Sequence, residues 1–434
     1  MHSLSLVYLV PLVILWLVWT LHGYFQSRRA SMVLEDNRAA GLGEPSSLHP
    51  VIDPARCLGC AACVRACPEK SVLGIFDGRA VLVEPTLCVG HGACATACPL
   101  DAITLVFGSE TRGVDIPVLT PEFETSIPGI FIAGELGGMG LVKNAVEQGR
   151  QAMVAIARRL RDRPASPGAL DVLIVGCGPA GIAASLGAEE AGLSFETLDQ
   201  STLGGTVAHF PRGKLVMTAP ADLPLVGRIK FSEIGKEALV AFWEEVIATH
   251  GLLPRFAEQV TGIHAAGDHF RVVSSRGEYR ARCVLLAIGR RGTPRPLNVP
   301  GEELDKVTYR LIDPEQYRGR RVLVVGGGDS ALEAATSIAE QEGSKVTLSY
   351  RGEAYGRARR KNRERLANHI RIGAIDQRLC STVVSIGRHD VILECEGELE
   401  TIPNDDVIIC AGGIMPHQFL QDIGIEVQTK FGTV

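Results

Sequence analysis

Two cysteine runs between residues 57 and 99 constrain this chain more than any other feature of its sequence. The first reads CLGCAACVRACP from Cys57 and has the complete spacing C-x-x-C-x-x-C-x-x-x-C-P. The second reads CVGHGACATACP from Cys88 and keeps that spacing, but His91 stands in place of its second cysteine. Thiolates at such short intervals can enclose an iron–sulfur cluster within one loop. The runs therefore predict iron–sulfur chemistry, and their Cys-Pro endings favour it over a zinc site or a set of disulfides.

Residues 51 to 107 resemble the bacterial two-cluster ferredoxin module, in which the fourth cysteine of each run binds the other cluster. The resemblance implies one 4Fe–4S cluster bound by Cys57, Cys60, Cys63 and Cys98. It implies a second cluster bound by Cys67, Cys88 and Cys94, with His91 at the fourth corner. Three interpretations of His91 stay open: a ligand to iron, a residue beside a three-iron cluster that does not bind iron, or part of a degenerate site.

The composition suggests a multidomain protein of a reducing compartment. A length of 434 residues suggests about three domains. The 48 glycines fit an α/β protein with many tight turns, and a formal net charge of −5 gives no reason to expect a nucleic-acid partner. Clustered cysteines favour metal binding over secreted disulfides.

An apolar stretch at the N-terminus predicts a membrane anchor. Leu4 to Leu21 form eighteen uncharged residues, which as a helix would be roughly 27 Å long. Aromatic residues follow at its end, and then Arg28 and Arg29. This order predicts a single-pass protein of the inner membrane with its other domains on the cytoplasmic side. The alternative of a cleaved signal peptide lacks a basic start and a small-residue cleavage site.

A first nucleotide-binding fingerprint begins at Asp171, in DVLIVGCGPAGIAASLGAEEAGLSFETLDQ. An apolar strand leads into Gly176, which permits a tight turn, and Gly178, which lets a pyrophosphate approach the backbone. Gly181 permits close packing of strand and helix, and the helix N-terminus faces the phosphates. Asp199 ends the next strand, where a carboxylate can accept hydrogen bonds from ribose hydroxyls.

A second fingerprint lies in VVGGGDSALEAA, with Gly326, Gly328 and Ala331 at the corresponding positions. Its second strand ends at Ser349 without an acid, and Arg351 follows. Further arginines come soon after, at Arg357, Arg359 and Arg360. A missing acid and nearby arginines favour a 2′-phosphate, and therefore NADPH, over NADH. NADH stays open, because these arginines also suit a solvated helix face.

The two fingerprints resemble those of the two-dinucleotide-binding flavoproteins, in particular thioredoxin reductase and its relatives. These include ferredoxin–NADP reductases of that type and bacillithiol disulfide reductases. The shared motifs, within residues 110 to 434, are GCGPAG, LGGT, LLAIG, VVGGGDSALEAA and SIPGIFIAGE. The resemblance implies FAD at the first fingerprint and at Gly204 and Gly205 of LGGT, and NADPH at the second fingerprint. It also leads us to expect a homodimer, since proteins of this family often dimerise.

The order of these motifs departs from the family. There the counterpart of SIPGIFIAGE closes the chain, and its acidic residue contacts FAD. Here Gly134 and Glu135 of that motif precede the first fingerprint. The order indicates a circular permutation in which residues 406 to 434 lead in space into about 113 to 160. A closing segment from another subunit and a linker are the alternatives.

The expected fold class is α/β, with two Rossmann-like domains, a small α+β ferredoxin domain and one transmembrane helix. The predicted parts are an anchor (1–30), a linker (31–50), the ferredoxin domain (51–107), the FAD-closing segment (108–165), the FAD domain (166–297), the NAD(P) domain (298–411) and a return to the FAD domain (412–434).

The function expected from these parts is electron transfer. Thioredoxin reductase has a C-x-x-C before its second fingerprint, but residues 307–321 contain no cysteine, which excludes dithiol exchange by that route. Flavin links two-electron nicotinamide chemistry to one-electron clusters. We therefore expect a membrane-anchored NAD(P)H oxidoreductase with an unknown electron-transfer partner and no catalytic side chain. His209 could face the flavin, or have a structural or substrate-pocket role. A non-catalytic redox sensor or relay subunit is the alternative, and disulfide reduction by an unpaired cysteine is a weaker one.

Overall fold

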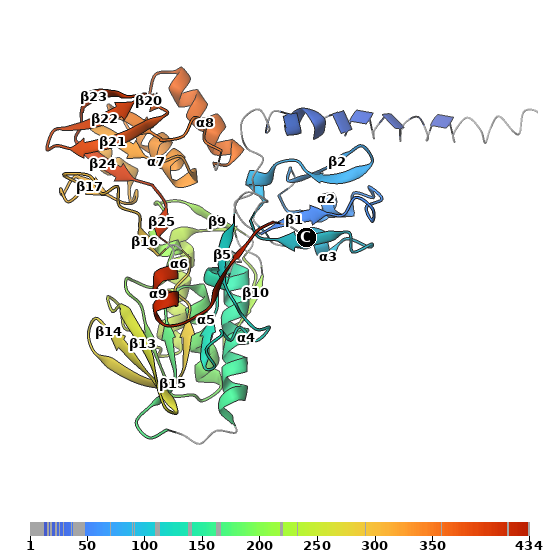
Figure 1. The fold of residues 1–434 in the computed structure, drawn as a ribbon, viewed down its shortest axis with the longest axis vertical. Helices are drawn as coiled ribbons and strands as arrows, with labels where there is room; N and C mark the ends of the chain where they lie inside the picture. Colours follow the sequence, from blue (N-terminus) through green and yellow to red (C-terminus); the bar gives the residue numbers. More distant parts are fainter. Residues whose placement is uncertain are drawn as a thin grey trace, which may run out of the picture. The chain divides into compact units, whose positions relative to one another are not determined.

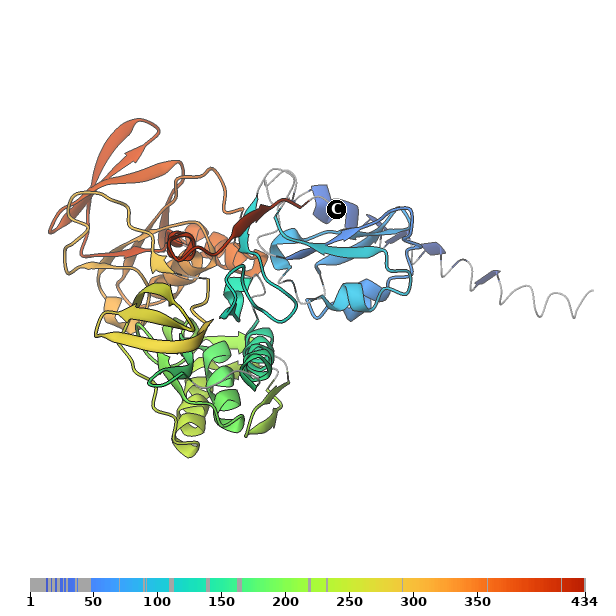
Figure 2. The same ribbon diagram turned by 60° about the horizontal axis from the view of Figure 1, so that its bottom comes forward.

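The computed structural model describes residues 48 to 432, apart from positions 70, 89, 91, 109–112, 138–140, 162–165, 218–219, 232, 291, 357 and 415, and scattered positions between 13 and 37. The chain divides into two units, shown in Figure 1 and Figure 2. One unit comprises Met1–Gly113 with Phe431–Val434, and the other comprises Val114–Lys430.

The predicted membrane anchor, Leu4 to Leu21, lies mostly outside the described residues. Where the structure does describe the chain, no helix is both long enough and apolar enough to cross a bilayer. The predicted single-pass location in the inner membrane is contradicted by this finding and is withdrawn. Residues 30 to 35, most of them predicted to be linker, are helical, and Ala30 is buried. Asn37 then donates a hydrogen bond of 2.9 Å to the carbonyl of Val83 in the ferredoxin module.

Two antiparallel strand pairs frame the cysteine runs in the first unit. They are β1 (His49–Ile52) with β4 (Ile103–Val106), and β2 (Leu73–Phe76) with β3 (Arg79–Leu82). Each run contains a short helix, α2 (Ala62–Ala66) or α3 (Ala93–Thr96), and η1 (Pro85–Leu87) precedes the second run. The buried core of this unit contains four of the cysteines as well as apolar side chains. A module of this size buries little apolar surface. The cysteines, with the clusters that they would bind, therefore complete its core.

A six-stranded sheet carries the first fingerprint in the second unit. Across the sheet the strands are β13 (Val260–Ala266), β14 (His269–Ser274), β15 (Glu278–Leu286), β7 (Leu170–Val175) and β8 (Phe195–Leu198), with β6 (Ile130–Ile132) also paired to β15. Strand β15 runs parallel to both β7 and β6. Helices α4 (Val142–Arg161) and α5 (Pro179–Glu190) pack together in one apolar core with these strands.

The segment before the fingerprint contributes β6 to this sheet, and its first strand forms a separate two-stranded sheet with the C-terminal end of the unit. The C-terminal strand β26 (Val427–Lys430), which follows α9 (His417–Asp422), pairs antiparallel with β5 (Val114–Pro117). Lys430 lies opposite Val114 in this pair. A chain that continued from Lys430 to Val114 would therefore form a β-hairpin. This arrangement is what the predicted circular permutation requires.

The second fingerprint lies in a five-stranded sheet in which all neighbouring strands are parallel. Its order is β17 (Val307–Thr308), β24 (Asp406–Ile409), β18 (Arg321–Val325), β19 (Lys345–Ser349) and β20 (Ile375–Arg378). Helices α7 (Asp329–Ala339) and α8 (Arg360–Arg371) share its core. A separate antiparallel sheet follows, with β21 (Ser381–Ile386), β22 (Asp390–Cys395) and β23 (Glu398–Pro403).

Short elements complete the second unit. The chain passes between the two main sheets along a pair of two-residue strands, β16 (Thr293–Pro294) and β25 (Gly413–Ile414). The remaining elements are η2 (Glu135–Gly137), η3 (Val207–His209), β9 (Leu215–Met217) with β12 (Glu233–Gly235), β10 (Ala221–Leu223) with β11 (Gly227–Ile229), α6 (Lys236–Thr249) and η4 (Pro314–Tyr317). The exact domain boundaries remain predictions.

Candidate redox site

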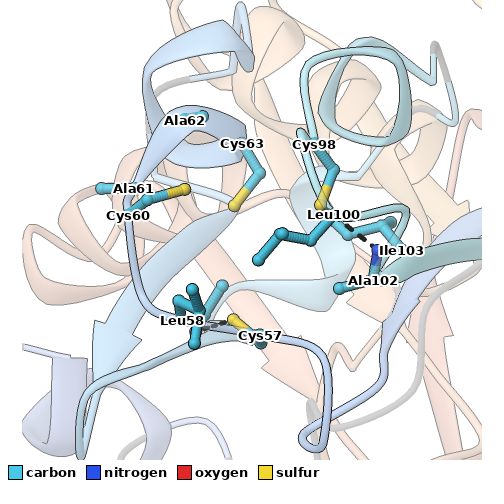
Figure 3. Close-up of a pocket in the computed structure, with 11 residues that line it drawn as sticks. Cys57, Leu58, Cys60, Ala61, Ala62, Cys63, Cys98, Leu100, Ala102 and Ile103 are labelled. Carbon is cyan, nitrogen blue, oxygen red and sulfur yellow. Dashed lines mark hydrogen bonds between the residues drawn. The ribbon is translucent and has the colours of Figure 1, made fainter.

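Four cysteines from the two runs line one pocket, as predicted for the first cluster. Cys57, Cys60 and Cys63 come from the first run, and Cys98 comes from the end of the second. Figure 3 shows their sulfur atoms around a common space. In the described part of the chain no three such side chains meet closely enough to bind a single ion. The four thiols fit a cluster, whose irons lie between the sulfurs.

Backbone amides point at two of these sulfurs. The amide of Ala80 donates to Cys57 Sγ at 3.3 Å, and the amide of Ala102 donates to Cys98 Sγ at 3.3 Å. Such donors stabilise negative charge on a thiolate, and hydrogen bonds to the sulfurs also tune the potential of a bound cluster.

The other three predicted cysteine ligands are all buried in the module. Cys67, Cys88 and Cys94 are 7%, 9% and 5% exposed and belong to the same buried core. Burial raises the pKa of Cys88 to about 11, so binding of iron would have to displace a firmly held proton. His91, predicted for the fourth corner, lies outside the described residues. The three predicted ligands that the structure describes therefore share one buried core.

Gly176 and Gly181 of the first fingerprint occupy places that exclude a side chain. Gly176 has φ +107°, and a Cβ there would lie 2.4 Å from the carbonyl oxygen of Ala287. A Cβ on Gly181 would lie 1.8 Å from the carbonyl oxygen of Gly176. Strand β7 and helix α5 thus meet as closely as the sequence predicted, and Gly178 stands at the N-cap of α5.

The LGGT loop lies against this fingerprint. The amide of Gly204 donates to the carbonyl of Cys177 at 2.9 Å. A Cβ on Gly205 would lie 3.1 Å from the Cα of Gly178. Two bare backbone segments beside a helix N-terminus form a cradle that fits the pyrophosphate of FAD.

Asp199 closes the cradle at the end of β8. It is 8% exposed and accepts hydrogen bonds of 2.7 Å from the amides of Cys177 and Ser201. Burial raises the pKa of this carboxyl group. His209 Nε2 lies 3.2 Å from Ser201 Oγ, which places His209 at the Asp199 end of the cradle.

Gly134 and Glu135 follow β6, and a residue that sequence reasoning missed holds their turn. Gly134 has φ +89°, and its amide donates to Gln148 Oε1 at 2.8 Å. Gln148 is a buried polar residue of α4. The sequence signal that could have identified Gln148 is its place among the apolar positions that the amphipathic helix α4 buries. Glu135 is half-buried.

The second fingerprint repeats the close packing of the first. A Cβ on Gly326 would lie 2.4 Å from the carbonyl oxygen of Cys410, and Ala331 is fully buried. Gly328 stands at the N-cap of α7 with open space around its Cα. A Cβ on Gly327 would lie 2.4 Å from the ring of Tyr350, so this tyrosine, which sequence reasoning missed, covers the loop.

The arginines predicted for a 2′-phosphate have varied surroundings. Arg351 is exposed beside Tyr350. The amide of Arg359 donates to Asp329 Oδ1 at 2.8 Å, and Arg360 pairs with Glu364 at 2.7 Å. Arg357 lies outside the described residues. The preference for NADPH therefore remains a prediction.

A family model described as pyridine nucleotide-disulphide oxidoreductase matches residues 173–433. The chain belongs to this family. A second model, a 4Fe-4S dicluster domain, matches residues 49–99 of this pyridine nucleotide-disulphide oxidoreductase. The two matches confirm the predicted combination of a ferredoxin module with a two-dinucleotide-binding flavoprotein.

Relatives of this oxidoreductase carry two kinds of name. A ferredoxin–NADP reductase of Ignicoccus hospitalis is 29% identical over 270 residues, covering 60% of this chain and 83% of that protein. Bacilliredoxin reductase Bdr of Bacillus subtilis is 25% identical over 270 residues, covering 60% and 82%. The solved structure of bacillithiol disulfide reductase Bdr (YpdA) from Bacillus cereus shares 25% identity with a TM-score of 0.53, over 59% of this chain and 82% of that one.

These similarities confirm an FAD-dependent NAD(P)H oxidoreductase whose cofactors are FAD, NAD(P)H and iron–sulfur clusters. The cradle at Gly176 and Gly205 and the cysteine pocket fit these groups. The assignment of each cofactor-binding residue and cysteine ligand, the electron-transfer partner and the homodimer remain predictions.

Proposed function

We propose that this oxidoreductase passes electrons between NAD(P)H and its two iron–sulfur clusters by way of FAD, to or from an external electron carrier. FAD, when bound, exchanges a hydride with NAD(P)H and exchanges electrons singly with clusters. The observation that carries the proposal is the convergence of Cys57, Cys60, Cys63 and Cys98 on one pocket, in a chain that also has two dinucleotide-binding loops.

The chain's own residues have binding and positioning roles in this proposal. The loops at Gly176 and Gly205 would hold the FAD pyrophosphate, and Asp199 would accept from its ribose. The loop at Gly326 and the N-terminus of α7 would hold the nicotinamide dinucleotide. Hydride transfer needs no side-chain acid or base, so none is assigned.

Disulfide reduction, for which some relatives are named, is less well supported. That activity needs an accessible thiolate. Cys177 lies in the first fingerprint, but it is 1% exposed, and burial raises its pKa to about 12. Residues 307–321, before the second fingerprint, contain no cysteine. These observations favour electron transfer to the clusters.

An anaerobic titration with NADPH, and in parallel with NADH, tests the proposal. We expect the visible absorbance of the flavin to bleach and low-temperature EPR signals of reduced clusters to appear. A Cys60→Ser variant should lose or alter the signal of one cluster while its flavin still bleaches. If the nucleotides bleach no flavin in the wild-type protein, the chain is a relay or sensor and the proposal fails.

A further inference from the structure

The larger unit has two parts: the FAD part contains the six-stranded sheet, and the nucleotide part contains the five-stranded sheet. A loop of the FAD part contacts the nucleotide part. The amide of Arg212 donates to the carbonyl of Ile312 at 3.1 Å. The guanidinium of Arg212 lies 3.3 Å from Asp313 Oδ2. Ile312 and Asp313 lead into η4, which lies between β17 and β18 of the five-stranded sheet. The two parts therefore touch at a place more than fifteen residues in sequence from either of the strands β16 and β25 that join them.

Lys214, in the same loop, forms the most shielded ion pair of this contact. Its Nζ lies 2.5 Å from Oε2 of Glu333, and the two side chains are 32% and 25% exposed. The ammonium group also lies 5.3 Å from the centre of the Phe210 ring. Partial burial strengthens such a pair relative to one in open solvent, and the ring adds a cation–π attraction.

Both members of the pair are held by their own side of the contact. The carbonyl of Lys214 accepts from the amide of Lys236 at 2.9 Å. Glu333 accepts from Asn362 Nδ2 at 3.1 Å, and the same amide group donates to Asp329 at 2.7 Å. Asp329 is the first residue of α7, next to the second fingerprint. Asn362 thereby holds Glu333 in place within the nucleotide part.

The covalent connection between the two parts is slight. It consists of two strands that pair over only two residues each, Thr293–Pro294 with Gly413–Ile414. Parts joined in this way move relative to one another unless further contacts fix them. Hydride transfer needs the nicotinamide ring and the flavin ring close together and well oriented. A displacement of about 1 Å can cost about a hundredfold in rate.

We propose that Lys214 and Glu333 are positioning residues, whose ion pair fixes the nucleotide part on the FAD part in the arrangement that supports hydride transfer. This inference rests on the proposed function. It concerns the rate of flavin reduction and leaves the affinity for the dinucleotide unchanged, because neither side chain belongs to the predicted nucleotide loops.

A charge-swap experiment on the holoprotein tests the inference. Lys214→Glu and Glu333→Lys should each slow flavin reduction by NADPH about tenfold in stopped flow. The Kd for NADP⁺ should change less than about twofold, and the double swap should recover most of the wild-type rate. Glu340→Lys is the matched control, since Glu340 pairs with Arg365 inside the nucleotide part and should leave the rate unchanged.

Hydrogen exchange gives a second readout that does not depend on activity. The Arg212 amide donates across the contact, so its exchange should speed up in both single variants and return to the wild-type rate in the double swap. Single variants that match the wild type in flavin reduction, or a double swap no better than either single, would overturn the inference. If the wild-type flavin is not reduced at all, the proposed function fails, and exchange at Arg212 alone decides whether the pair fixes the two parts.

Discussion

At the scale of single residues, backbone conformation distinguishes the two cysteine runs. Ala61, just before α2, has φ +58°, and Gly92 holds the corresponding place before α3 with φ +75°. The left-handed conformation costs an L-residue roughly 1–2 kcal/mol and costs glycine almost nothing. The first run therefore carries local strain that the second run avoids.

This difference predicts opposite effects for a matched pair of substitutions. Gly92→Ala should destabilise the module by about 1 kcal/mol, because it imposes the left-handed cost. Ala61→Gly should be neutral or slightly stabilising, because relief of strain offsets the greater entropy of the unfolded chain. Loss of cluster absorbance during urea titration measures both, and equal effects of the two substitutions would contradict the explanation.

At the scale of elements, the contact between α4 and α5 depends on one glycine. A Cβ on Gly149 would lie 2.1 Å from the carbonyl oxygen of Ala180. That oxygen is backbone, so the helices themselves would have to separate. The contact between α4 and α5 therefore leaves no room for a side chain at Gly149.

We expect Gly149→Ala to destabilise the FAD part by about 2 kcal/mol through overpacking. Thermal unfolding and retention of FAD measure the effect. Gly277→Ala is the control, because a Cβ there would meet nothing within 4 Å and its φ is not positive. Similar melting temperatures for the two variants would show that the helices adjust without cost.

The ion pair between Arg321 and Asp405, at the start of β18 in the five-stranded sheet, predicts that stability depends on pH. Arg321 at the start of β18 donates three hydrogen bonds to the carboxylate of Asp405, at 2.6 to 3.0 Å, and hydrogen bonds from its side chain hold the pKa of Asp405 below its usual value. A lowered folded-state pKa means that the stabilisation is complete above the unfolded pKa, about 3.9, and declines as pH falls below it.

We therefore expect Asp405→Asn to lower the free energy of unfolding by about 1 kcal/mol near neutral pH, since the pair is partly exposed. The difference from the wild type should stay constant from about pH 5 to pH 8 and shrink below about pH 4. Chemical unfolding at several pH values measures it. A difference that grows on acidification would show the opposite linkage.

At the scale of the whole molecule, the second unit contains everything that its main sheets need. Strand β5 at its start pairs with β26 at its end, and β6 and α4 complete the FAD sheet and core. A chain that starts at Val114 should therefore fold, bind FAD and lack clusters. Removing residues 427–434 as well takes away the partner of β5 and should lower the melting temperature by several degrees. Absorbance spectra and melting curves check both expectations.

Much of the site could be predicted from sequence, because its chemistry is local. The spacing of Cys57, Cys60 and Cys63 puts three thiols in one loop, and Gly176, Gly178 and Gly181 report a strand–turn–helix within six residues. The position of Glu135 before the fingerprint indicated that its segment belongs to the FAD part, where β6 joins the sheet and α4 joins the core. The apolar run Leu4–Leu21 misled, since hydropathy alone assigned a membrane span, whereas no helix among the described residues is long and apolar enough to cross a bilayer.

The sequence by itself determined the cofactor classes, because cluster and dinucleotide loops each need particular residues at fixed short intervals. Only the tertiary structure decided which residues support those loops. Gln148 holds the turn at Gly134, and Tyr350 covers the second fingerprint. Lys214 meets Glu333 across 119 residues of sequence. No local pattern encodes such contacts, since they depend on how separate elements pack once their apolar faces are buried.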